Sequence, residues 1–106
     1  MPLCVINSFS EIAKGVIINS NSVVEHDNLL MDYSSLAPGV KTGGNVTIGI
    51  RSAVSIGTTI KNNIKVGSDS VIGASSYLNK NVEDNSIYYG NPAKFIRNRE
   101  IGEKYL

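Results

Sequence analysis

The only histidine of the chain, His26, stands between two carboxylates, Glu25 and Asp27. A carboxylate can hold an imidazole in one tautomer and raise its basicity, so this triplet has the composition of an acid–base centre. A lone histidine is more often structural, and the two flanking acids are the feature that favours chemistry here. The triplet therefore predicts a general base at His26, with Glu25 and Asp27 as the groups that orient it.

Metal and thiol chemistry find little support in the composition. The single cysteine, Cys4, excludes an intramolecular disulfide and a cysteine-based zinc site, and we interpret it as a small hydrophobic residue. A tris-imidazole zinc site needs three histidines, which one histidine per chain supplies only on the axis of a trimer. We expect no metal cofactor.

Charge and hydropathy argue against two classes of partner. The 106 residues allow one small domain, and a net charge of +1 with 18% charged residues leaves no basic face for nucleic acid or an anionic membrane. The first residues show no basic region followed by an apolar run, and no apolar stretch approaches the length of a membrane span. We expect a cytoplasmic protein that binds neither nucleic acid nor membrane.

A six-residue repeat predicts the elements that must hold these groups. Counting by six from Ile6 to Leu78 gives thirteen positions, and only Thr42 among them is not aliphatic. A second column, four residues later, is mostly small or β-branched, and the residue directly after the aliphatic one is often Ala or Gly, which we interpret as room for a tight turn. A period of six fits neither a helix nor a two-faced sheet. It fits short parallel strands joined by corners, with three strands to each eighteen-residue coil.

The predicted architecture is an all-β solenoid with a cap. Residues 1–83 form about four coils, and each aliphatic residue of the repeat points to the axis. Residues 84–106 close the open end within the same domain, as a short strand over 87–89, a turn over 90–92 and a helix over 93–105.

This pattern resembles the hexapeptide-repeat acyltransferases, whose fold is a left-handed parallel β-helix. Within that superfamily the chain is similar to the sialic acid O-acetyltransferases and to the N-acetyltransferases that act on UDP-linked 4-amino sugars. The resemblance covers nearly the whole chain and is carried by residues 16–20, the triplet around His26, residues 36–39, Gly43 with Gly44, and residues 89–94. It implies the left-handed sense of the coil, which the spacing alone does not show.

The resemblance also implies residue roles near the base. His26 would remove the proton of the acceptor, and Asn19 would join Glu25 and Asp27 in binding the acceptor or orienting the base. Members commonly place a second histidine nine residues after the base, where this chain has Ser35. We therefore place Asn19 and Ser35 in the acceptor site.

The acyl donor implied by the resemblance is acetyl-CoA. The Gly44 N–H would stabilise the thioester oxyanion, and pantetheine would lie along the coils between two subunits of a homotrimer. Candidate donor contacts beyond Gly44 are Ile56, Gly57, Gly73, Ala74 and Lys94, and Lys80 and Arg97 are further candidates for the CoA phosphates.

The implied function is direct transfer of an acetyl group to a hydroxyl or amine of a sugar or sugar nucleotide, without a covalent intermediate. Members usually begin with a small Rossmann-like domain that helps to bind a nucleotide sugar, and we expect this chain to lack it because Ile6 already lies in the repeat. The alternative is a catalytically inactive β-helix scaffold or a regulatory partner of a fuller acetyltransferase. A γ-class carbonic anhydrase relative, which shares the fold, would need three zinc-bound histidines.

Overall fold

The computed structural model describes residues 4–100, and all regular structure within them is β-strand. Thirteen two-residue strands follow one another every six residues, and two longer strands end the described chain. The strands are β1 (Val5–Ile6), β2 (Glu11–Ile12), β3 (Ile17–Ile18), β4 (Val23–Val24), β5 (Leu29–Leu30), β6 (Ser35–Leu36), β7 (Lys41–Thr42), β8 (Thr47–Ile48), β9 (Ala53–Val54), β10 (Thr59–Ile60), β11 (Lys65–Val66), β12 (Val71–Ile72), β13 (Tyr77–Leu78), β14 (Ser86–Gly90) and β15 (Ala93–Asn98). The predicted all-β repeat is confirmed.

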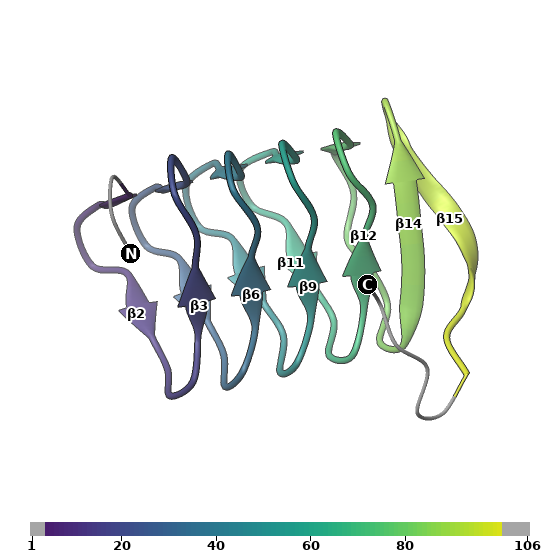
Figure 1. Ribbon diagram of the computed structural model, residues 1–106, viewed down its shortest axis with the longest axis horizontal. Coiled ribbons are helices and arrows are strands. Elements are labelled where there is room, and N and C mark those ends of the chain that lie inside the picture. The colour runs from purple at the N-terminus through teal and green to yellow at the C-terminus, as the bar shows by residue number, and fades with distance from the viewer. Residues whose placement is uncertain (1–3, 101–106) are drawn as a thin grey trace.

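Three stacked sheets form the sides of the solenoid (Figure 1). Sheet A has the order β1-β4-β7-β10-β13, sheet B the order β2-β5-β8-β11, and sheet C the order β3-β6-β9-β12-β14-β15. Neighbouring strands of the repeat are parallel and eighteen residues apart, as in the pairing of Val5 with Val23. The solenoid is longer than the four coils predicted, because Val82 bridges to Val66 and β14 pairs with β12, so that the stacking continues into a fifth turn.

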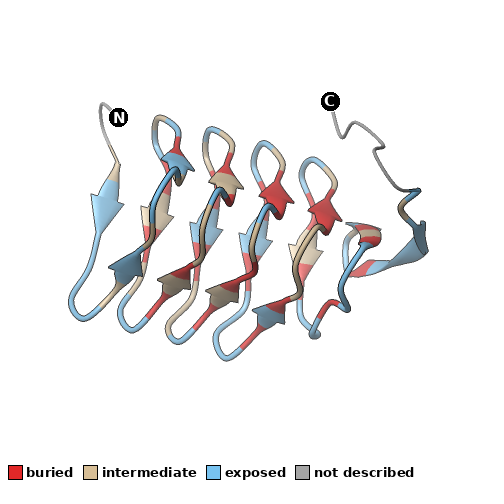
Figure 2. Cartoon of the chain, turned by 90° about the horizontal axis from the view of Figure 1, so that it is seen from below, coloured by how far each residue is buried: buried red, intermediate tan, exposed pale blue. Residues whose placement is uncertain are grey.

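The core is the aliphatic column of the repeat. From Ile18 to Leu78 every member is at most 4% exposed, and Figure 2 shows the buried positions recurring in successive turns. Thr42 is tolerated there because its hydroxyl accepts a hydrogen bond from the Glu25 backbone N–H at 3.1 Å. Ile6 and Ile12 remain 42% and 38% exposed, since the described part of the chain stacks on their turn from one side only.

The second column of the repeat is buried from Ser22 to Val82, and its hydroxyl groups donate to backbone carbonyls of their own corner or of a neighbouring turn. The Ser22 hydroxyl donates to the Ala37 carbonyl at 2.9 Å, and the Ser70 hydroxyl donates to the Glu83 carbonyl at 2.6 Å. A buried hydroxyl without such a partner would be costly. These serines therefore add hydrogen bonds between turns to the strand ladders.

The small residue directly after each aliphatic one does not make the turn. The left-handed corner residue comes two positions later, with φ near +60° at Asn21, Asp27, Asn45 and equivalent positions. Gly49 instead provides close stacking, because a methyl group there would lie 2.5 Å from the backbone carbon of Gly67. The tight-turn interpretation of this column was wrong.

The predicted helix over 93–105 is also wrong where the structure describes it. Residues 93–98 form β15, which pairs antiparallel with β14 in a hairpin, and residues 101–106 lie outside the described part. The Tyr88 and Phe95 rings pack edge to face with centroids 5.7 Å apart, and Ala93 is fully buried. The segment has a helix-like composition, but backbone hydrogen bonds to the open edge of β14 outweigh that local preference.

Candidate active site

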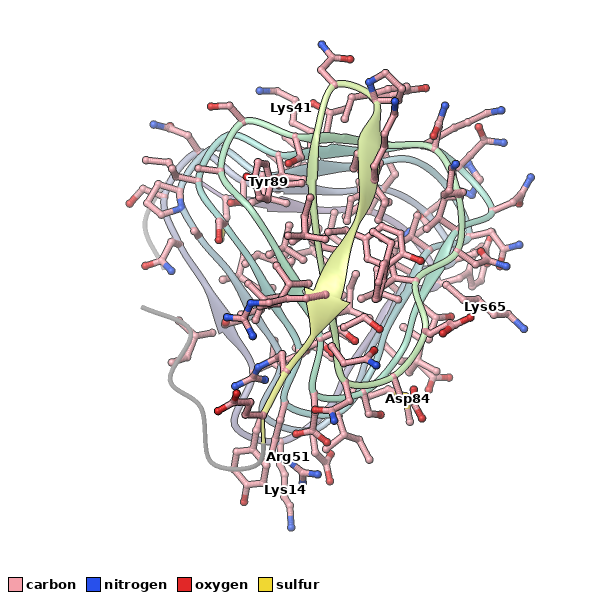
Figure 3. The ribbon with its side chains drawn as sticks, turned by 90° about the vertical axis from the view of Figure 1, so that its right-hand side faces the viewer. Lys14, Lys41, Arg51, Lys65, Asp84 and Tyr89 are labelled. Carbon is pink, nitrogen blue, oxygen red and sulfur yellow. The ribbon has the colours of Figure 1, made fainter. Side chains whose placement is uncertain are left out.

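The corners between sheets form three edges that run along the solenoid. Residues eighteen apart lie next to each other on one edge, because the strands that flank them are paired. The AB edge joins sheets A and B and holds corners 7–10, 25–28, 43–46 and 61–64; the BC edge holds 13–16, 31–34, 49–52 and 67–70; the CA edge holds 19–22, 37–40, 55–58 and 73–76. Figure 3 looks along the solenoid, with Lys41 on sheet A at the top, Lys65 on sheet B at the right, Tyr89 on β14 at the upper left and Arg51 on the BC edge at the bottom.

His26 lies on the AB edge with its ring open to solvent. Its Nδ1 is 3.0 Å from Oδ2 of Asp27, and the two side chains are 61% and 56% exposed. Asp27 is the left-handed residue of this corner, with φ of 57°. A carboxylate at Nδ1 favours the tautomer that carries the Nδ1 proton. The Nε2 lone pair is then available to take a proton from a substrate hydroxyl or amine.

Glu25 makes different contacts from those the sequence predicts. Its Oε1 accepts a hydrogen bond from Asn7 Nδ2 at 2.9 Å, on the preceding turn of the same edge. Its backbone carbonyl accepts a hydrogen bond from the Ser10 hydroxyl at 2.7 Å. Of the two carboxylates predicted to orient the base, Asp27 contacts the imidazole and Glu25 bonds to Asn7.

Gly44 lies one turn beyond His26 on the same edge. A methyl group on Gly44 would lie 2.5 Å from Cε1 and 2.6 Å from Nε2 of His26, so the imidazole occupies the space that any side chain would need. The Gly44 carbonyl accepts a hydrogen bond from the Asn63 N–H at 2.9 Å. Its own N–H donates to no group in the described residues. A free backbone donor therefore lies next to the candidate base.

Asn19 and Ser35 share a cleft on the outer face of sheet C. The cleft has a volume of about 220 Å³ and is lined by Ile17, Asn19, Ser35, Ala37, Ala53, Val54 and Ser55. Asn19 donates from Nδ2 to the Leu36 carbonyl at 3.0 Å. The small apolar lining residues were not predicted as site residues, although the eighteen-residue spacing of Ile17, Ser35 and Ala53 could have indicated a shared face.

The predicted donor contacts lie farther along the CA edge and on the hairpin. Ile56 is 54% exposed, Ala74 is exposed and Gly57 has a left-handed φ of 70°. A methyl group on Gly73 would lie 2.5 Å from Cβ of Tyr89, so this glycine makes room for the tyrosine. Lys94 is exposed and pairs with Tyr89 across the hairpin.

One chain does not bring the two sets of predicted residues together. His26, Asp27 and Gly44 lie on the AB edge, whereas Ile56, Gly73 and their neighbours lie on the CA edge, with the full width of sheet A between them. A single site that uses both sets would have to combine edges of two copies.

Two other kinds of site have no support in the described part of the chain. Residues 4–100 contain no group of three or more His, Cys, Asp or Glu side chains arranged to hold a metal ion. The same residues also form no helix that is long and apolar enough to cross a membrane.

Known proteins of similar sequence are acetyltransferases, although no family model matches the chain. A probable macrolide acetyltransferase of Lysinibacillus sphaericus is 41% identical over 61 residues, which are 58% of this chain and 34% of that protein. Serine acetyltransferase 4 of Arabidopsis thaliana is 30% identical over 86% of this chain and 28% of its own length. The chain thus spans about a third of these curated relatives.

Solved structures of similar fold are also acetyltransferases. PerB of Caulobacter crescentus, a perosamine N-acetyltransferase solved with CoA and GDP-perosamine, has a TM-score of 0.87 and 30% identity over 88% of this chain and 45% of its own. The acetyltransferase domain of PglB from Neisseria gonorrhoeae, solved with acetyl coenzyme A, has a TM-score of 0.78 and 25% identity over 90% of this chain and 55% of its own. A hexapeptide-repeat serine O-acetyltransferase of Brucella melitensis has a TM-score of 0.81 and 28% identity over 86% of this chain and 39% of its own. The chain is therefore a hexapeptide-repeat β-solenoid whose sequence relatives and structural neighbours are acetyltransferases.

Proposed function

We propose that this chain transfers an acetyl group from acetyl-CoA to a hydroxyl or amine of a sugar or sugar nucleotide. The observation that carries the proposal is the packing of the His26 imidazole against Gly44, whose N–H has no hydrogen-bond partner among residues 4–100. A base and an oxyanion donor side by side are the two groups that direct acyl transfer requires. The CoA and GDP-perosamine bound in the perosamine enzyme support the substrate class.

In the proposed reaction, Nε2 of His26 takes the proton of the acceptor O–H or N–H as that atom attacks the thioester carbonyl. Asp27, 3.0 Å from Nδ1, stabilises the imidazolium that forms. The Gly44 N–H donates to the oxyanion of the tetrahedral intermediate. Collapse of that intermediate breaks the C–S bond, and the CoA thiolate leaves with the proton held by His26. No covalent enzyme intermediate forms.

The site is proposed to lie between two copies of the chain in a homotrimer. The AB edge of one copy would supply His26 and Gly44, and the CA edge of the next would supply the groove for pantetheine. This arrangement agrees with the separation of the two sets of residues in one chain and with the closed symmetry usual for soluble oligomers. The groove residues are Ile56, Gly57, Gly73 and Ala74, with Lys94 near the CoA phosphates and with Asn19 and Ser35 toward the acceptor.

Titration calorimetry with acetyl-CoA, with light scattering on the same sample, tests the donor site and the trimer. Acetyl transfer is then measured on GDP-perosamine and on a panel of amino and hydroxy sugars. We expect wild type and His26→Ala to bind acetyl-CoA equally and turnover of His26→Ala to fall about 10²–10⁴-fold, because only the general base is lost. Equal turnover of the two proteins would exclude His26 as the base.

A scaffold or regulatory partner of a fuller acetyltransferase is the second candidate. Ser35 favours it, because members of the resembled family commonly carry a histidine at that position. A well-folded trimer that binds no acetyl-CoA would support this second function over the first.

A further inference from the structure

Asn28 differs from the other residues of the second buried column. The column from Ser10 to Val82 contains serine, threonine, valine and isoleucine, and Asn28 is its one carboxamide. The residue is 2% exposed and lies directly inside the corner that carries His26. A buried carboxamide is costly unless it is hydrogen-bonded, so its contacts need a reason.

The carboxamide of Asn28 joins the corner of the base to the corner of the oxyanion donor. Nδ2 donates to the His26 carbonyl at 3.1 Å and to the Gly43 carbonyl on the next turn at 3.0 Å. The Oδ1 atom accepts no hydrogen bond from the part of the chain that the structure describes. In the same column, the Ser22 hydroxyl reaches the Ala37 carbonyl of the next turn at 2.9 Å. The Ser70 hydroxyl reaches the Glu83 carbonyl of the next turn at 2.6 Å and, at 3.4 Å, the Ser68 carbonyl of its own corner. Asn28 thus holds both candidate corners through one group.

The bond to Gly43 fixes the direction of the Gly44 N–H. The Gly43 C=O and the Gly44 N–H belong to one planar trans peptide unit and point in opposite directions. Because Asn28 holds the carbonyl toward the inside, the N–H is directed outward, at the glycine whose Cα the His26 ring covers. Two successive glycines form the most conformationally free peptide of this edge. The polar groups on either side of this peptide have other partners. The Gly43 N–H donates to the Ile60 carbonyl at 2.7 Å, and the Gly44 carbonyl accepts from the Asn63 N–H at 2.9 Å.

We propose that Asn28 is a positioning residue that locks the Gly43–Gly44 peptide with its N–H aimed at the acyl oxygen. It touches no substrate and acts through Gly44 and the backbone of His26. The expected effect on kcat rests on the proposed acetyl transfer. The orientation of the Gly43–Gly44 peptide does not depend on that proposal and can be measured separately.

Two substitutions separate this role from packing. Asn28→Val places in the column a residue that it already accepts at Val40 and Val46, and it removes both carboxamide bonds. Asn28→Ser retains a hydroxyl that can reach the Gly43 carbonyl, as the hydroxyls of Ser22 and Ser52 reach the equivalent carbonyls of their next turns. The matched control is Ser52→Val, which removes the bond of the Ser52 hydroxyl to the Gly67 carbonyl on the BC edge, away from His26.

We expect Asn28→Val to lower kcat about 10–100-fold, with KM for acetyl-CoA within about twofold, because the donor is lost only in the transition state. Asn28→Ser should recover part of that loss, and Ser52→Val should leave kcat unchanged below its melting temperature. An equal fall of kcat in Ser52→Val, or an unchanged kcat in a folded Asn28→Val, would overturn the proposal.

A second measurement decides the inference even if no acetyl transfer is found or if Asn28→Val does not fold. Backbone ¹⁵N relaxation dispersion reports exchange between peptide orientations at Gly43 and Gly44. We expect flat profiles there in wild type and Ser52→Val, and exchange in Asn28→Val or, with smaller amplitude, in Asn28→Ser. Flat profiles in every folded Asn28 variant would show that the carboxamide does not hold this peptide. Absence of transfer by wild type would refute the proposed function alone.

Discussion

Asp27 and Glu25 flank His26 symmetrically in the sequence and asymmetrically in space. The left-handed φ of Asp27 brings its Oδ2 to 3.0 Å from the imidazole Nδ1, whereas the Glu25 carboxylate bonds to Asn7 on the preceding turn. Both acids carry a carboxylate next to His26 in the sequence, but only the carboxylate of Asp27 contacts the imidazole. Removing the charge of each acid in turn therefore tests which one supports the base.

We expect Asp27→Asn to lower kcat about 10–100-fold, since the carboxamide no longer stabilises the imidazolium or selects its tautomer. Glu25→Gln keeps an oxygen that can accept from Asn7 and should leave kcat within about threefold of wild type. Steady-state acetyl transfer with saturating acetyl-CoA measures both variants. A larger loss in Glu25→Gln than in Asp27→Asn would reverse the assignment.

At the scale of elements, the two glycines that follow Thr42 are needed for different neighbours. A methyl group on Gly43 would lie 2.5 Å from the backbone nitrogen of Asn62 on the next turn, and that backbone is held in the strand stack. A methyl group on Gly44 meets the ring of His26, an exposed side chain that can rotate away. One glycine serves turn stacking, and the other serves the site.

Gly43→Ala should therefore destabilise the solenoid by about 1–3 kcal/mol, because two turns must separate to admit the methyl group. Gly44→Ala should change stability by less than about 1 kcal/mol and still lose most acetyl transfer, since the base is displaced. Urea unfolding and activity are measured on the same preparations. A stable Gly43→Ala or a fully active Gly44→Ala would contradict this division of roles.

The BC edge carries an ion pair between consecutive turns. Arg51 donates from Nε to Asp69 Oδ1 at 2.7 Å and from Nη2 to Oδ2 at 2.9 Å. These hydrogen bonds hold the pKa of the Asp69 carboxyl below its ordinary value and raise the pKa of Arg51. A carboxyl whose pKa is lower in the folded state stabilises the fold above its unfolded pKa, and this contribution is lost as the pH falls through the folded pKa.

We expect Asp69→Asn to melt below wild type at neutral pH by a small margin, because the pair is largely solvent-exposed. The two melting temperatures should converge as the pH falls below about 4, where the wild-type carboxyl becomes protonated. Thermal unfolding across that range measures the difference, and Arg51→Gln should reproduce it. A margin that widens toward low pH would show that the pair does not act in this direction.

At the scale of the whole molecule, the separation of the AB and CA edges predicts that a complete site needs two copies. His26→Ala removes the base from one edge, and Ile56→Glu places a charge in the proposed pantetheine groove of the other. Each variant alone has every site damaged. A mixed trimer contains some sites in which the intact AB edge of one copy meets the intact CA edge of its neighbour.

Random mixing of equal amounts should restore about a quarter of wild-type activity, because each site draws its two edges from independent copies. Light scattering first confirms that each variant alone assembles as wild type does, and activity is measured after subunit exchange. Recovery would support a site shared between copies. No recovery from exchanged trimers would place the whole site in one chain.

The sequence by itself determined the solenoid. A hexapeptide column buries one aliphatic residue per strand, and this pattern depends only on local side-chain direction and spacing, so the strands from β1 to β13 could be predicted before any contact was known. With three strands to each coil, as the repeat was interpreted, Gly44 already lies one turn from His26. The candidate base could also be identified from the sequence, because a histidine flanked by two carboxylates is visible in three consecutive residues.

Only the tertiary structure decided which contacts these residues make. The choice of Asp27 over Glu25 depends on a corner conformation and on Asn7 one turn away, and the role of Asn28 depends on a carbonyl that a neighbouring turn presents. The segment 93–98 became a strand because β14 offered it an open sheet edge, which outweighs weak local helix preference. These contacts join residues of different turns, so they depend on how the turns stack and cannot be predicted from one local stretch of the sequence.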